Sequence, residues 1–202
     1  YMNALCEKMK VKCTWVVQDW DGIIPALLAN KYDVIVAGMN ATDERRKRVD
    51  FTSVYTKIPP AAIAAKSYVG GDLSPAALKG KTLGTQGSTT HANYLEAMYK
   101  GFDIKLFPTQ EEANLALAQG RVDIVIADKL SLQDFIDAKG KDCCKMIADV
   151  VRDAKIHGDG VAMAVRKGDD ALKDLLSKAI DESMKDGTHE KARAKWFKVP
   201  IM

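Results

Sequence analysis

The sequence predicts an α/β protein of two lobes, each a mostly parallel sheet flanked by helices. Three observations support this: helix and strand patterns alternate along the chain, "ALLANKYDVIVAG" (26–38) and "LALAQGRVDIVIAD" (115–128) form a quasi-repeat, and an extended stretch follows each half. Alternating helices and strands are typical of parallel sheets, because each crossover between parallel strands uses a helix. With 202 residues, the chain has room for two lobes of roughly 100 residues each.

The first half predicts helices at 1–9 and 22–30, strands at 13–18 and 32–37, and a short helix that starts at Thr42. The strand "DVIVAG" is apolar throughout, as expected for a strand covered on both faces.

The second half predicts strands at 81–86, 103–107 and 122–128, a helix from about Ser88, and a helix at 109–119. The last helix has the clearest boundaries. Thr109 and Glu112 have the spacing of a capping box, and Gly120 supplies the stop.

Two extended stretches divide the chain. The prolines of "YTKIPPAAIAAK" (55–66) favour a stiff crossover, and the glycines of "GDGVAMAVRKGD" (158–169) suit a hinge. Two crossovers imply a discontinuous first lobe. The predicted organisation is lobe 1 at 1–58 and 163–202, lobe 2 at 63–157, and hinges at 59–62 and 158–162.

Composition excludes several classes of function. The net charge is only +3, from 30 basic and 27 acidic residues, and no basic stripe interleaved with aromatics is present, so nucleic-acid binding is not expected. No apolar run approaches the ~20 residues of a membrane span, and a soluble chain is expected. Motifs of catalysis are lacking too: "GTQGSTTH" does not have the Gly-x-Ser-x-Gly spacing, and the three histidines, His91, His157 and His189, have no ligand spacing. Neither a metal nor a cofactor is expected.

Candidate binding residues follow the carboxyl ends of the predicted strands, where parallel α/β sheets bind ligands. Arg45 offers a planar fork that pairs with a carboxylate. The hydroxyls of "QGSTT" (86–90) precede a helix N-terminus, which favours an anion. Asp128 can accept from an ammonium group or, alternatively, cap the next helix. Trp20 either contacts the ligand or is a core or rim aromatic. The set complements a zwitterion.

The cysteines leave alternatives open. Cys6 and Cys13 lie seven residues apart, across a helix-to-strand turn that can bring them within disulfide reach, and two buried free thiols fit the spacing equally well. Cys143 and Cys144 are adjacent, so a disulfide between them would be strained and a metal site is not expected.

Several motifs together resemble one family, the periplasmic amino-acid-binding proteins of ABC importers, particularly the lysine/arginine/ornithine and histidine binders. The motifs span nearly the whole chain: "DWDGIIPALLANKYDVIVAGM", "TDERRKRVDFT", "LKGKTLGTQGST", "EEANLALAQGRVDIVIAD", "AVRKGD" and "DGTHEKARAKWF". The resemblance implies a type II periplasmic-binding-protein fold in which two lobes close around one free, polar, basic amino acid and present it to the permease subunits in the membrane.

The resemblance also assigns roles. It implies that Arg45 holds the ligand carboxylate with Asn40, Ser88 and Thr89, that Asp128 and Gly38 receive the ammonium group, and that Trp20 packs against the ligand side chain. The full expected set is Trp20, Ala37, Gly38, Asn40, Arg45, Thr85, Ser88, Thr89, Thr90 and Asp128. It further implies a Cys6–Cys13 disulfide, formed in an oxidising periplasm.

Family members begin with a strand upstream of the position of Tyr1, so lobe 1 is expected to lack its central strand here. The sequence opens in the middle of a helix pattern, and residues with any export signal are expected upstream. A monomer is expected, or a strand-swapped dimer if the truncation is genuine. Alternative functions are a cyclohexadienyl-dehydratase-like enzyme with Asp128 as its acid or base, an opine binder, and a sensor module.

Overall fold

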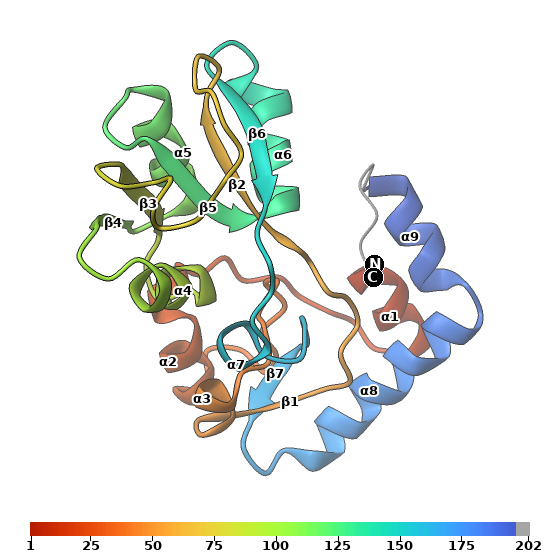
Figure 1. The fold of residues 1–202 in the computed structure, drawn as a ribbon. Coiled ribbons are helices and arrows are strands. Elements are labelled where there is room, and N and C mark those ends of the chain that lie inside the picture. The colour runs from red at the N-terminus through yellow and green to blue at the C-terminus, as the bar shows by residue number, and fades with distance from the viewer. Residues whose placement is uncertain (197–202) are drawn as a thin grey trace. The chain divides into compact units, whose positions relative to one another are not determined.

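The computed structural model describes residues 1–196, which divide into two compact units (Figure 1). Unit 1 contains residues 1–57 and the chain from Gly158 onward, and unit 2 contains Ile58–His157. Unit 1 is therefore discontinuous in sequence. Within the described residues, no helix is both long enough and apolar enough to cross a bilayer.

Unit 2 is built on a five-stranded sheet. Its strand order is β4 (Asp103–Phe107), β3 (Thr82–Gln86), β5 (Ile124–Asp128), β2 (Pro60–Ala65) and β6 (Cys144–Asp149). The pairs β3–β4 and β3–β5 are parallel, whereas β2 runs antiparallel to both β5 and β6. The sheet is mixed where the sequence predicts mostly parallel pairing. The difference arises because residues 60–65, predicted as crossover, are buried and pair as a strand.

Alternate residues of these strands pack on opposite faces, as the two-residue period of a strand requires. Ala61, Ile63, Val125 and Ala127 pack with residues of α5 (Gln110–Ala118) and α6 (Lys129–Phe135). Ala62, Ala64, Ile124 and Ile126 pack on the other side with residues of α4 (Thr90–Met98). Figure 1 shows α6 alongside β2 and β6. A π-helical segment (Ile136–Gly140) and α7 (Ala154–His157) complete the helices described in unit 2.

Local sequence signals define the helix ends in unit 2. Thr89 and Thr109 cap α4 and α5, each accepting a hydrogen bond from the backbone N–H three residues later. Gly120 follows α5 with φ of 70°, a left-handed conformation that favours glycine. The predicted helix starts and the predicted stop are confirmed.

Unit 1 contains helices on both sides of a short antiparallel pair, β1 (Val49–Phe51) and β7 (Ala164–Arg166). Ala162 and Ala164 pack with Ile23 and Leu27 of α2 (Ile23–Leu28). Met163 and Val165 pack instead with α1 (Met2–Lys8) and α8 (Asp170–Lys185). The remaining elements described are a 3-10 turn, η1 (Trp20–Gly22), and helices α3 (Asp43–Arg46) and α9 (Thr188–Trp196).

The predicted strands 13–18 and 32–37 are wrong as paired strands. The structure assigns no strand to either segment, and the second makes only an isolated bridge between Ile35 and Ala164. Trp15, Val16 and Val17 are 58%, 58% and 98% exposed. The two segments, with residues of α1 and α8, line a groove of about 620 Å³. A strand is stabilised by pairing along its edges, and no described segment supplies that pairing here.

Both cysteine pairs are oxidised. Cys6 and Cys13 form the expected disulfide, with a Cα–Cα distance of 6.2 Å, and join the end of α1 to the following extended segment. Cys143 and Cys144 form a second disulfide at the start of β6, although adjacency argued against that bond.

Gly158 is expected to be the glycine least tolerant of substitution in unit 1. It has φ of 65°, and a Cβ there would lie 2.2 Å from the carbonyl oxygen of Ala41. We predict that Gly158→Ala lowers the free energy of unfolding by at least about 3 kcal/mol, since it adds a backbone clash to a left-handed conformation. Gly168→Ala is the matched control, because φ is 79° and nothing lies within 4 Å of its Cβ position. It should cost about 1 kcal/mol. Urea unfolding measures both, and equal losses would contradict the clash.

Candidate functional site

Arg45 is fixed by the local structure of a short helix in unit 1. Thr42 caps α3 by accepting a hydrogen bond from the Arg45 backbone N–H at 3.3 Å. The guanidinium Nη1 donates to the carbonyl oxygen of Asn40 at 3.0 Å. The first bond fixes the backbone of α3, and the second orients the guanidinium, whose planar fork matches a carboxylate.

Trp20 supports the same guanidinium. The Arg45 guanidinium carbon lies 5.2 Å from the centroid of the Trp20 ring, within the range of a cation–π interaction. Trp20 opens the 3-10 turn ahead of α2, and its side chain is half-buried against the unit 1 core. The structure therefore brings together Trp20, Asn40 and Arg45 from three separate segments.

The backbone ahead of α3 turns at Gly38, in a conformation that favours glycine. Gly38 has φ of 66°, and Asn40 is buried with an antiparallel bridge to Val161. Ala37 is exposed and lines the groove described above. Gly38 thus turns the chain out of the extended segment and toward the cap at Thr42.

In unit 2, the turn between β3 and α4 gathers the predicted hydroxyl residues. Thr89 accepts from the Ala92 backbone N–H at 3.1 Å and donates to the Gln86 carbonyl at 2.8 Å. Ser88 is exposed with φ of 57°, which non-glycine residues rarely adopt and which is found at functional turns. Thr90 opens α4 and is buried. The turn leads into the positive end of a helix, a setting that favours an anion.

Thr85 has a structural partner. Its side chain is fully buried, and its hydroxyl donates to the Ile126 carbonyl on the neighbouring strand β5 at 2.7 Å. This bond links β3 and β5 near their carboxyl ends.

Asp128 ends β5, and its side chain makes no capping hydrogen bond to α6. Asp128 thus occupies the N-cap position of α6, as the alternative interpretation expects, but its side chain does not cap the helix. One carboxylate oxygen, Oδ1, instead lies 3.2 Å from Nε2 of His91 in the first turn of α4, and the Asp128 side chain is 26% exposed. A partly exposed carboxylate at a strand end can accept hydrogen bonds from an ammonium group.

Two histidines of this region belong to no motif or ligand spacing in the sequence. His91 is buried beside Asp128, and the His157 ring centroid lies 5.9 Å from that of His91 and 5.4 Å from that of Tyr94. Burial is the main cause that lowers the pKa of His157 below its usual value. A signal for His91 existed, because adjacent parallel strands β3 and β5 bring the turn after one close to the residue that ends the other.

The geometry does not form a nucleophile relay. A histidine that activates a nucleophile bonds a carboxylate through one ring nitrogen and the nucleophile through the other. Nδ1 of His91 is buried without a hydrogen-bond partner among the described residues. In the same part of the chain, no group of three or more histidine, cysteine, aspartate or glutamate residues could hold a metal ion.

Comparisons with known proteins agree with one another. The sequence profile described as bacterial extracellular solute-binding proteins, family 3, matches residues 1–199. An L-arginine-binding protein of Pseudomonas aeruginosa is 38% identical over 202 residues, which cover 98% of this chain and 78% of the relative. A lysine/arginine/ornithine-binding periplasmic protein of Escherichia coli is 36% identical over 201 residues, which cover 96% of this chain and 76% of the relative. The solved structure of an ancestral arginine-binding protein bound to arginine has a TM-score of 0.87 at 34% identity. The match covers 97% of this chain and 85% of that structure's chain.

Proposed function

We propose, because this chain belongs to the bacterial extracellular solute-binding proteins of family 3, that it is the amino-acid-binding component of an ABC importer. Its ligand is a free L-amino acid with a basic side chain. The names of the relatives support this class, since they include binders of arginine and of lysine, arginine and ornithine. The chain binds and releases its ligand without making or breaking a covalent bond.

The geometry around Arg45 is the observation that best supports this proposal. In unit 1, a helix cap fixes the Arg45 backbone, and a backbone carbonyl and an aromatic ring orient its guanidinium. We assign the ligand α-carboxylate to this fork, together with the backbone of Asn40 and the turn at Ser88, Thr89 and Thr90. Pairing a carboxylate with a pre-oriented arginine loses less side-chain entropy than pairing it with a flexible lysine.

We assign the α-ammonium group to Asp128, with the backbone near Gly38, and the ligand side chain to Trp20. The carboxylate of Asp128 and the cation of Arg45 complement the two charges that every free amino acid carries at its backbone. The basic preference is supported by the relatives rather than by these backbone contacts.

The periplasm is the proposed compartment, and the permease subunits of the importer are the proposed protein partners. The Cys6–Cys13 disulfide supports an oxidising compartment. The E. coli relative is itself described as periplasmic.

A ligand screen tests the function. We expect L-arginine, L-lysine, L-ornithine or L-histidine to raise the melting temperature of the protein, because a ligand at about 100 times its Kd adds about 2.7 kcal/mol of stability. The same plate carries neutral and acidic amino acids and opines as comparisons. A response to opines alone would move the proposal to opine transport. Turnover of arogenate or prephenate would replace it with an enzyme, and a flat response to every compound would refute it.

A further inference from the structure

A cluster of titratable side chains surrounds the carboxylate of Asp128 in unit 2. Nε2 of His91, on α4, lies 3.2 Å from Oδ1 of Asp128. The rings of Tyr94 and His157 lie 5.4 Å apart, and those of His91 and His157 lie 5.9 Å apart. Arg152 donates to the His157 carbonyl at 3.0 Å and so places a positive charge on the same side. The proposed ammonium acceptor thus has a titratable neighbour in direct contact.

Two ring nitrogens of this cluster are buried without a hydrogen-bond partner among the described residues, Nδ1 of His91 and Nε2 of His157. Buried polar atoms are nearly always paired in folded proteins, so each exception calls for an explanation. The side chain of His91 is only 7% exposed, although histidine is a residue whose charged form prefers water. A structural role alone is better filled by an apolar residue at this position.

Hydrogen bonds set the proton position of neutral His91 but not that of neutral His157. Nδ1 of His157 lies 3.2 Å from the Asp153 backbone nitrogen and 3.1 Å from the Asp153 carbonyl oxygen, so it accepts or donates according to the tautomer. The carboxylate of Asp128 only accepts, so Nε2 of neutral His91 donates to it and Nδ1 keeps a lone pair. In this state His91 orients Asp128 and adds no charge.

We propose that His91 is a positioning residue for Asp128 whose protonation weakens amino-acid binding, an inference that rests on the proposed role of Asp128 as the ammonium acceptor. When neutral, His91 holds the carboxylate through one N–H donor. A second proton, on Nδ1, makes the imidazole a cation 3.2 Å from the carboxylate. The imidazolium then forms an ion pair with the Asp128 carboxylate, so the ligand ammonium must compete for that carboxylate. The imidazolium also repels the ammonium.

The polar and titratable groups that face His91 are the Asp128 carboxylate, 3.2 Å from Nε2, and the His157 ring, 5.9 Å away between centroids. His157 contributes little charge near neutral pH, because burial lowers its pKa. Binding of a cationic ammonium to Asp128 therefore expels a proton from the protonated form of His91.

The test is isothermal titration with L-arginine at six pH values from 5.5 to 7.5. This window lies above the ordinary carboxyl range and below the α-amino range, so histidine is the group that titrates in it. For the wild-type protein, we expect Kd to be at least fivefold higher at pH 5.5 than at pH 7.5. Repeating the titration near pH 6 in buffers of different ionisation enthalpy should reveal proton release on binding.

His91→Gln separates positioning from titration, because the amide donates one hydrogen bond and does not titrate in this window. We expect Kd at pH 7.5 within about threefold of wild type, a flat pH profile and no proton release. His91→Leu, which has no donor, should weaken binding at every pH. His157→Gln is the control, and its Kd should change with pH as that of the wild type does. Melting temperatures at each pH confirm that every variant is folded during the titration.

Two results would overturn the inference. One is a wild-type Kd that does not change with pH, and the other is a His91→Gln variant whose Kd changes with pH as strongly as that of the wild type. Loss of the slope in His157→Gln alone would also overturn it, and would assign the effect to the other histidine. Failure of the proposed function gives a different signature, since wild-type protein would then bind no amino acid at pH 7.5.

Discussion

Arg45→Ala is expected to raise the Kd for the ligand amino acid by about a thousandfold or more. Removing one partner of a hydrogen-bonded charge pair in a binding site costs about 2–5 kcal/mol or more, and each tenfold change in Kd corresponds to about 1.4 kcal/mol. The upper part of this range applies because the structure pre-orients Arg45 through Thr42, Asn40 and Trp20. Isothermal titration with L-arginine measures the change.

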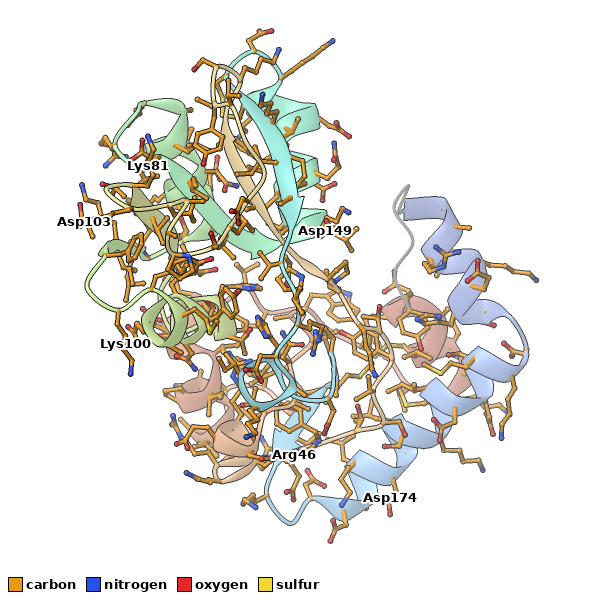
Figure 2. All side chains as sticks on the ribbon, viewed as in Figure 1. Arg46, Lys81, Lys100, Asp103, Asp149 and Asp174 are labelled. Carbon is orange, nitrogen blue, oxygen red and sulfur yellow. A yellow bond between two sulfur atoms is a disulfide. The ribbon has the colours of Figure 1, made fainter. Side chains whose placement is uncertain are left out.

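Arg46→Ala provides a matched control for Arg45→Ala. Arg46 is the next residue of α3, carries the same side chain, and is labelled in Figure 2. Its guanidinium pairs with Asp159 at 2.9 Å, and the two side chains are 40% and 71% exposed. Surface pairs of this kind contribute about 0–1 kcal/mol to stability, so Arg46→Ala should bind like wild type.

Arg45→Lys distinguishes charge from geometry. Lysine keeps the positive charge but loses the planar fork and the stacking on Trp20, so we expect a Kd between those of wild type and Arg45→Ala. Thermal unfolding of all three variants shows whether α3 survives the substitutions. Wild-type affinity in a folded Arg45→Ala protein would remove Arg45 from the site.

The helices were predictable because their signals are local. Thr89 and Thr109 cap the helices that follow them, and a cap needs only a hydroxyl three residues ahead of a backbone N–H. The strands depended on partners far away in sequence. Residues 124–128 became β5 because β2 and β3 flank them, whereas residues 13–18 have the pattern of a strand and no pairing partner among the described residues.

The candidate site also contains two kinds of residue: those that the local sequence indicates, and those whose contacts only the fold reveals. The places of Arg45 and Asp128 after apolar strand patterns make them candidates without knowledge of the fold, and their roles as ligand contacts stay predictions. The hydroxyl of Thr85 looked equally available in the sequence, yet it bonds Ile126 across the sheet. His91 and His157 have no ligand spacing in the sequence, and only the packing of α4 against α7 places their rings 5.9 Å apart. Side chains that act through a neighbour leave no periodic pattern in a sequence.

Asp128→Asn is expected to raise the Kd for L-arginine by about a hundredfold. Asparagine has nearly the same shape and still accepts a hydrogen bond, so the loss measures the negative charge opposite the ligand ammonium. A charge-assisted hydrogen bond contributes about 1.5–3 kcal/mol, in agreement with that factor. The substitution should also leave α6 intact, because the Asp128 side chain does not cap it.

Asp149→Asn is the control for charge alone. Asp149 ends β6, is labelled in Figure 2, and pairs with Lys129 at 2.6 Å while its side chain is 60% exposed. Both variants remove one negative charge from unit 2, so a general effect of net charge would weaken binding equally in the two. We expect Asp149→Asn to bind within about twofold of wild type, as expected for an exposed pair. If Asp128→Asn also binds like wild type, the ammonium group has another acceptor. The proposed effect of His91 on binding would then have no carboxylate through which to act.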